Sequence, residues 1–435
     1  MSAQGPRSLR ARVPRALLDP GPGASLPCGD GEGLLAVELR ISPRSGGIEA
    51  ITPLAADMAA LPLVLPTLVE PHAHLDKAFS WQPFANPTGR MEEAMAINGR
   101  EAAERTAEVV LARGERALQR AWCYGLRAIR SHVDSVGPQA SPSWEALHEL
   151  QRRWHGRMGL QLSALVPLEH WSTPTGEDLA RRLAGTDGLL GGVLGPPFAE
   201  SYRHTAALRQ LLRLADRLGL AIDLHIDESD SQAGRGLLLL LRELRRTPVS
   251  VPITCSHCSS LSLLPAARQR RLAAELAARG IAVVALPSTN LWLLARGRRS
   301  STALRPMAPV QLLQQEGVAV AIGGDNVQDP WYPGGDFDPI ELLRLSLSAL
   351  RLGPWQRQGL MPFSSVPARL LDLNWDGVLR PGAPADLIVL SADHWSELLA
   401  RPPQRRVLRS GQWLPPPPTE QPSQLLATLE EPLHP

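Results

Sequence analysis

Short apolar runs alternate with longer helical segments through the middle of this 435-residue chain. The runs are continuous in apolar residues, which is typical of parallel strands that are buried on both faces. Leucine at helical spacing, among arginine and glutamate, marks the segments between them. Eight strands that alternate with eight helices predict an α/β fold, the (β/α)₈ or TIM barrel. The predicted strands are 61–69, 126–130, 160–166, 189–194, 220–225, 251–255, 281–286 and 318–322, and the predicted helices are 92–121, 142–155, 176–184, 203–218, 234–246, 264–279, 308–316 and 338–351.

The two ends of the chain have a different character. Residues 8–55 and 374–413 contain short alternating stretches with Pro- and Gly-containing turns, which favour strands. We therefore expect a small β-sandwich domain formed by both termini, built from residues 1–60 and 374–415, next to a barrel that spans residues 61–373. Residues 416–435 are rich in proline and are expected to form an extended tail.

Composition narrows the classes of partner. The chain has 45 Lys and Arg against 43 Asp and Glu, so we expect neither nucleic acid nor an anionic membrane as a partner. No apolar run is long enough to span a bilayer. Four cysteines are too few for a disulfide scaffold, and the opening residues lack the apolar segment of a secretory signal, so we expect a cytoplasmic protein.

Polar side chains follow several of the predicted strands, at the end of the barrel where chemistry takes place. A single histidine beside an apolar run is more often a packed residue than a ligand. Here five of the eleven histidines stand at such positions, which indicates a shared site. The residues are His72 and His74 after the first strand, His132 and Asp134 after the second, His225, Asp227 and Glu228 after the fifth, His257 and Cys258 after the sixth, and Asp325 and Asn326 after the eighth.

The His-x-His spacing of His72 and His74 has a physical reason. At the end of a strand, residues i and i+2 point to the same side, so both imidazoles can bind one metal ion. Imidazole nitrogens together with a carboxylate such as that of Asp325 make a site suited to zinc or ferrous iron. Such a metal lowers the pKa of a bound water from about 15.7 to near 7. Glu228 lies three residues after His225, where it can carry protons without binding the metal.

Five motifs, "EPHAHLDK", "RSHVD", "LHIDE", "TCSHC" and "GGDNVQDPWYPGG", resemble the amidohydrolase superfamily, in particular its cytosine deaminase-like branch. The resemblance covers roughly residues 8–415. It implies one divalent metal ion, Fe²⁺ or Zn²⁺, and hydrolytic deamination of a cytosine-like cyclic amidine or related N-heterocycle through metal-bound hydroxide. The implied metal ligands are His72, His74, His225 and Asp325; the implied catalytic residues are Glu228, which shuttles protons, His257, which hydrogen-bonds the hydroxide, and Asp325, which takes its proton; and Trp331 is implied to pack beside the substrate.

The chain departs from the cytosine deaminase pattern at the positions that read the substrate. Leu168 stands where those enzymes carry a glutamine, Asn326 replaces a second aspartate, and Gly324 replaces a histidine. Losing a hydrogen-bonding partner changes selectivity strongly, so another cyclic amidine or a triazine fits the sequence as well as cytosine does. The sequence leaves open whether Glu169 and His170 replace the lost contact or are ordinary loop residues.

Lys77 is the single lysine among the 45 basic residues. Arginine and lysine differ in shape and hydrogen bonding, so the retained lysine indicates a role that arginine would not serve. Two interpretations stay open at this point: Lys77 binds an anionic or carbonyl part of the substrate, or it forms a salt bridge to Asp76 or Asp134. His132 and Asp134 are expected to support the metal ligands.

Taken together, the sequence predicts a homo-oligomeric hydrolase of carbon–nitrogen bonds that acts on a small N-heterocycle. One alternative is an amidohydrolase that removes an alkylamine from an s-triazine-like ring or opens a cyclic amide. An alternative from a different class is a catalytically silent barrel kept for assembly. The complete set of ligands together with Glu228 argues against the silent barrel, because a scaffold needs none of them.

Overall fold

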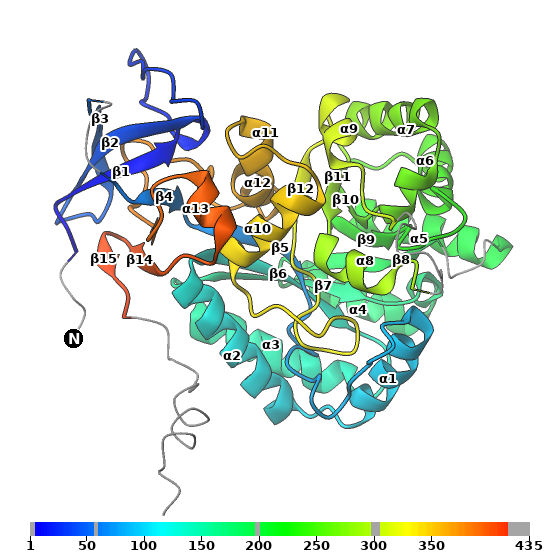
Figure 1. Cartoon of the computed structure of the whole chain (residues 1–435). Helices are drawn as coiled ribbons and strands as arrows, with labels where there is room; N and C mark the ends of the chain where they lie inside the picture. Colours follow the sequence, from blue (N-terminus) through cyan, green and yellow to red (C-terminus); the bar gives the residue numbers. More distant parts are fainter. Residues whose placement is uncertain (1–4, 56–59, 196–200, 297–304, 416–435) are drawn as a thin grey trace, which may run out of the picture.

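The computed structural model describes residues 5–55, 60–195, 201–296 and 305–415. Eight parallel strands, hydrogen-bonded in chain order from β5 to β12, form a barrel with helices packed around it (Figure 1). This arrangement confirms the predicted barrel. The strands are β5 (Leu68–Ala73), β6 (Leu126–Asp134), β7 (Gly159–Leu165), β8 (Leu189–Leu194), β9 (Ile222–Ile226), β10 (Ile253–His257), β11 (Ala282–Ala285) and β12 (Val320–Ile322).

The predicted helices are present, with one correction. The segment 92–121 forms two helices rather than one, because Thr106 caps the second helix by accepting a hydrogen bond from the amide of Val109. Short helices after residue 286 escaped the sequence analysis, because a few residues give no helical periodicity. The helices are α1 (Met91–Ala103), α2 (Ala107–Tyr124), α3 (Ala140–Trp154), α4 (Pro174–Ala184), α5 (Tyr202–Leu218), α6 (Arg235–Arg246), α7 (Ala266–Ala278), α8 (Pro287–Leu293), α9 (Val310–Gln315), α10 (Pro339–Ala349), α11 (Arg357–Leu360), α12 (Ser365–Leu370) and α13 (Trp395–Ala400).

Segments near the two ends of the chain meet in a separate seven-stranded sheet, which lies beside the barrel in Figure 1. A core of its own, which includes Val37, Leu39 and Leu408, lies within this part of the molecule. The sheet order is β15 (Gln412–Trp413), β14 (Arg405–Arg409), β13 (Leu387–Leu390), β4 (Leu63–Pro66), β1 (Ser8–Pro14), β2 (Leu34–Ile41) and β3 (Ile48–Pro53). The predicted tail, 416–435, lies outside the described residues.

The predicted first barrel strand, 61–69, is divided between the two sheets. Its first half, β4, pairs with β13 in the terminal sheet, and its second half continues as β5 in the barrel. Pro66 ends β4, and proline cannot donate a hydrogen bond to a ladder. An unbroken apolar run therefore contained a boundary that hydrophobicity alone does not mark.

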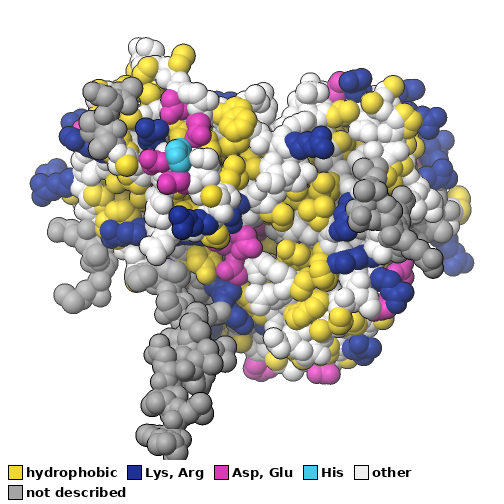
Figure 2. All heavy atoms as spheres, viewed as in Figure 1, with side chains coloured by type: hydrophobic (Ala, Val, Ile, Leu, Met, Phe, Trp, Pro, Cys, Tyr) yellow, Lys and Arg dark blue, Asp and Glu magenta, His cyan; other side chains and the backbone are white. Residues whose placement is uncertain are grey.

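Basic side chains are scattered over the face that Figure 2 shows rather than gathered in one patch. The single lysine, Lys77, is buried. Within the described ranges, none of the helices combines the length and the apolar character needed to cross a bilayer.

Candidate metal centre and substrate cavity

Four side chains that the sequence proposed as ligands converge at the carboxyl ends of the barrel strands. His72 and His74 come from the end of β5, His225 from β9, and Asp325 follows β12. The Oδ1 atom of Asp325 lies 3.5 Å from Nε2 of His72 and 3.2 Å from Nε2 of His74. The Nε2 atoms of His225 and His74 are 3.4 Å apart.

A chain of hydrogen bonds fixes which nitrogen of His72 faces the site. Ser256 donates its hydroxyl hydrogen to Asp223 at 2.7 Å, and Arg130 holds the other carboxylate oxygen of Asp223 at 2.8 Å. The Ser256 oxygen therefore accepts from Nδ1 of His72, at 3.0 Å. Because Nδ1 carries the proton, the Nε2 lone pair of His72 is free to bind a metal.

The chemistry of these groups fits a divalent cation. Burial lowers the pKa of His72, His74 and His225 well below the ordinary histidine value, and neutral imidazole is the form that binds metals. The Nε2 atom of His72 is buried and has no hydrogen-bond partner among the described residues. A buried polar atom without a partner is costly, and a metal ion would satisfy it.

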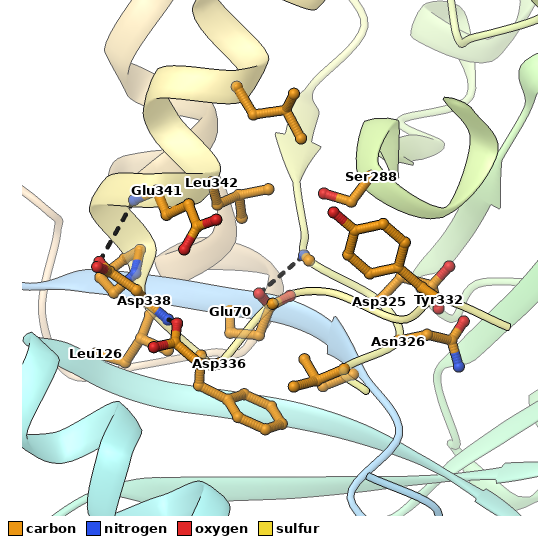
Figure 3. A pocket seen from close by; sticks show the side chains of 17 residues that line it. Glu70, Leu126, Ser288, Asp325, Asn326, Tyr332, Asp336, Asp338, Glu341 and Leu342 are labelled. Atoms are coloured by element: carbon orange, nitrogen blue, oxygen red, sulfur yellow. Dashed lines mark hydrogen bonds between the residues drawn. The ribbon is translucent and has the colours of Figure 1, made fainter. Parts of the chain in front are cut away.

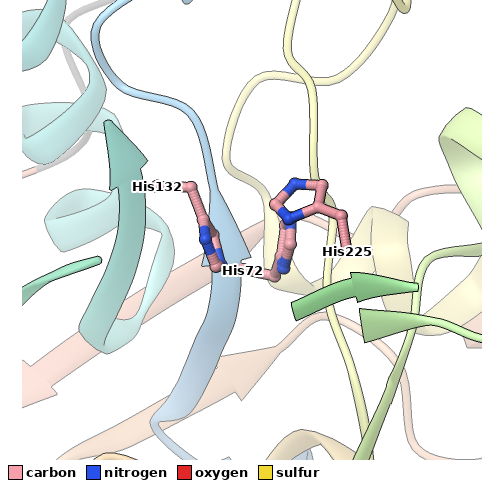
Figure 4. A group of neighbouring side chains, drawn as sticks. All are labelled: His72, His132 and His225. Atoms are coloured by element: carbon pink, nitrogen blue, oxygen red, sulfur yellow. The ribbon is translucent and has the colours of Figure 1, made fainter. Parts of the chain in front are cut away.

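His132, expected to act only in support, lies closer to the ligands than the sequence indicated. Its ring centroid is 3.9 Å from that of His72, and His72, His132 and His225 place one nitrogen each within 4.8 Å of one another (Figure 4). Within the described part of the chain, neither ring nitrogen of His132 has a hydrogen-bond partner. His72, His257 and Asp325 form a second group of the same kind.

A buried carboxylate behind the site holds the loop that carries Asp325. Glu70 accepts hydrogen bonds from the amides of His72 and Gly324, both at 2.9 Å. Figure 3 shows the Glu70 carboxylate with its bond to the Gly324 amide. A Cβ atom at Gly324 would lie 3.1 Å from Oε2 of Glu70, so the carboxylate takes the space of a side chain there. Asp325 itself has a φ of 65°, a strained conformation for a non-glycine residue. Glu70 carries no recognisable signal in the sequence, because its partners are backbone amides.

Glu228, His257 and Asn290 form a polar group beside the ligands. Nδ1 of His257 lies 3.4 Å from Oε1 of Glu228, and the Asn290 amide contacts both, at 3.2 Å and 3.3 Å. Burial first, and then the nearby charge of Asp325, raises the pKa of Glu228 well above that of an ordinary glutamate. Asn290 comes from the short helix α8, which the sequence analysis missed.

A cavity of about 390 Å³ opens over this site. Its lining includes His74, His225, Glu228, His257 and Asp325 from the centre itself. Lys77, Asn326 and Trp331, which the sequence proposed as substrate contacts, also line the cavity.

Lys77 forms the salt bridge that was one of the two interpretations of the sequence, and its contact with a substrate stays a prediction. Its ammonium group donates to Oδ1 of Asp134 at 3.1 Å, and the residue also lines the cavity. Arg105 binds the other oxygen of Asp134 at 3.3 Å and binds Asp76 at 2.8 Å. Asp134 therefore anchors the lysine, and the remaining ammonium hydrogens are available to a ligand.

The position of Leu168 differs from the expectation that it contacts the substrate. It is fully buried in the barrel core, where a Cβ atom on Gly192 would lie 2.8 Å from its side chain, and it is not part of the cavity lining. The neighbouring lining residues are Val166 and Pro167. Glu169 is half exposed and pairs with His204 at 3.1 Å, so it does not take the place of the expected glutamine.

Comparison with known proteins points to one family. A family profile described as "Amidohydrolase family" matches residues 85–414. Pterin deaminase from Rhizobium rhizogenes (strain K84 / ATCC BAA-868) is 33% identical over 396 residues, which cover 87% of this chain and 88% of the relative. N-isopropylammelide isopropyl amidohydrolase from Pseudomonas sp. (strain ADP) is 22% identical over 343 residues, which cover 76% and 80% of the two chains.

A solved structure has a similar fold over most of the chain. 5-Methylcytosine deaminase from Klebsiella pneumoniae, with 5-fluorocytosine bound, superposes with a TM-score of 0.77 at 26% identity, covering 94% of this chain and 97% of that one. The family profile and the solved structure both match most of the chain. The chain belongs to the amidohydrolase family and is a hydrolase of carbon–nitrogen bonds.

Proposed function

We propose that this protein hydrolytically deaminates an N-heterocycle that carries an amino group and a ring oxo group. In this proposal one divalent metal ion, Zn²⁺ or Fe²⁺, is held by His72, His74, His225 and Asp325. The observation that carries the proposal is the convergence of these four side chains beside a cavity that Glu228 and His257 also line. Pterin deaminase and 5-methylcytosine deaminase, the named relatives, support the same class of reaction.

The metal, when bound, would supply Lewis acidity and a water of lowered pKa. Burial raises the pKa of Glu228, which favours its protonated form, and in this proposal Glu228 protonates the ring nitrogen next to the amino-bearing carbon. Asp325 accepts the proton released as water adds to that carbon and returns it to the amino group, which leaves as ammonia. The new hydroxyl group gives its proton back to Glu228 and becomes the ring carbonyl.

The cavity lining orients the ring for this step. Lys77 donates from its anchored ammonium group to the ring oxo group. Asn326 is held by Asp329 at 2.8 Å and lies with Trp331 along the same lining. His257 contributes a neutral imidazole, because its burial lowers the pKa of its side chain to about 3.

Homo-oligomeric assembly stays a prediction.

Ammonia release from a panel of rings tests the proposal. The panel comprises pterin, isocytosine, cytosine, 5-methylcytosine and creatinine, with enzyme of known metal content. We expect Glu228→Gln to keep its metal and lose turnover by at least about 10²–10⁴-fold, since it cannot transfer a proton. The exposed Glu92→Gln serves as the control. Metal-loaded enzyme that releases ammonia from none of these rings would contradict the proposal.

A second candidate is the removal of an alkylamine from a triazine. The relative N-isopropylammelide isopropyl amidohydrolase favours it, and so does the apolar part of the cavity lining. Adding N-isopropylammelide to the panel and measuring isopropylamine separates this reaction from deamination.

A further inference from the structure

Two strongly exposed apolar side chains line the cavity. Met95 is 43% exposed and Val136 is 40% exposed, whereas His74, His225 and Asp325 at the metal centre are buried. The cavity therefore runs from a polar floor to an apolar mouth. The other large hydrophobic residues of comparable exposure in the described ranges, Tyr202, Leu238, Trp355 and Leu399, do not line it.

The wall at the mouth is one face of helix α1. Its lining residues are spaced at intervals of three and four along the helix, as expected for side chains that share a face. Methionine is flexible and polarisable, and it packs well against flat rings. The α1 residues in the lining are Met91, Met95, Asn98, Gly99 and Ala102.

Val136 faces the same space from the segment after β6. Gln139 donates a hydrogen bond from its side chain to the Val136 carbonyl, at 2.5 Å, and so helps to fix this segment. Ser135, Val136 and Gln139 all belong to the lining. Two elements from different parts of the chain thus present apolar side chains at one opening of the cavity.

The volume exceeds what a single ring needs. Cavities that hold drug-sized ligands have volumes of about 300–1,000 Å³, and the 390 Å³ of this cavity falls within that range. A single pyrimidine ring on the floor, held by Lys77 and Glu228, would leave the apolar mouth in contact with water. A larger planar molecule would reach from the metal centre to Met95 and Val136 and would exclude that water.

We propose that the substrate is a fused two-ring heterocycle, whose amino-bearing ring lies on the floor and whose second ring packs against Met95 and Val136. This inference rests on the proposed function, and it narrows the substrate from N-heterocycles in general to fused ones. Met95 and Val136 then determine specificity by contact with the ring that does not react.

Pterin and isocytosine make a matched pair for the test, because isocytosine is the reacting ring of pterin without the fused second ring. We expect the unaltered enzyme to favour pterin in kcat/KM by about a hundredfold. Met95→Ser and the nearly isosteric Val136→Thr should each lower kcat/KM for pterin about tenfold and leave isocytosine and metal content unchanged. Leu238→Ser, an exposed site on α6 outside this cavity, is the control.

Equal loss for both rings in Met95→Ser, or equal turnover of both by the unaltered enzyme, would overturn the inference. Equilibrium binding of pterin and of isocytosine to the Glu228→Gln variant tests the two-ring site independently of the proposed reaction. Tighter binding of pterin than of isocytosine, weakened by Met95→Ser, supports the two-ring site even if no ring is deaminated. Equal binding of the two rings rejects it even if deamination is found.

Discussion

The backbone amide of Asp325 donates a hydrogen bond of 2.9 Å to the carbonyl oxygen of His72. This bond, with the parallel bridge between Ala73 and Asp325, joins the last barrel strand region to the first. Both residues are proposed metal ligands. Closing the barrel and assembling the metal centre are therefore one structural event, and changes at this seam should affect metal binding and stability together.

Glu70 tests that coupling. Its carboxylate accepts from the amides of His72 and Gly324, whereas the amide nitrogen of a glutamine cannot accept. We expect Glu70→Gln to leave one buried N–H unsatisfied, to cost about 1–3 kcal/mol of stability and to reduce metal content. Thermal unfolding and elemental analysis measure both effects, with the exposed Glu49→Gln as control. If the Glu70→Gln protein is clearly destabilised but keeps a normal metal content, then closure of the barrel and metal binding are not coupled.

His132 packs on the ring of His72 at 3.9 Å without a hydrogen-bond partner of its own among the described residues. We expect His132→Gln to weaken metal affinity about 10–100-fold, as loss of a group that positions ligands does. His72→Gln should weaken it further, because it removes a proposed ligand. Competition against a chelator of known affinity gives both values, and the exposed His155→Gln is the control. Unchanged affinity in His132→Gln would show that its ring does not support the ligands.

Lys77 is paired with Asp134 and still lines the cavity. An arginine at this position would form a bidentate pair with Asp134 and offer the substrate fewer donors. We expect Lys77→Arg to raise KM about tenfold for rings with an oxo group and to leave metal content unchanged. Rings that lack the oxo group provide the control in steady-state kinetics. An equal rise in KM for both kinds of ring would argue against a contact with the oxo group.

Asp329 gives stability a pH dependence. Burial raises the pKa of Asp329 to about 7, partly offset by the charge of Lys77 and by hydrogen bonds from Asn326 and the Trp331 amide. An unfolded aspartate has a pKa of about 3.9. Between these values the folded chain keeps a proton that the unfolded chain has released, so the free energy of unfolding falls as pH rises, by up to about 1.4 kcal/mol per pH unit.

Asp329→Asn removes this ionisation while one side-chain oxygen still accepts from the Trp331 and Tyr332 amides. We expect the melting temperature of the variant to rise relative to that of the unaltered protein as the pH increases from 5 to 7. Both proteins are measured with chelator, so that metal binding does not contribute. A constant difference in melting temperature across this range would contradict the assignment.

Local pattern predicted much of this protein. Continuous apolar runs identified the barrel strands, because a strand buried on both faces has no polar side. Polar residues placed directly after those runs identified His72, His74, His225 and Asp325 as neighbours, because parallel strands end at one rim. Both the apolar runs and the polar residues that follow them are visible within a short stretch of sequence. The barrel topology follows because strand and helix alternate repeatedly along the chain.

Other features depended on which distant segments meet. The amide partners of Glu70, the contact between His132 and His72, and the Asn290 bonds to Glu228 join residues whose own surroundings in the sequence carry no signal. Leu168 points into the core because the chain turns into a short helix directly after Pro167. Side-chain direction at such a turn is set by packing against Gly192 and the rest of the core, so only the tertiary structure could decide it.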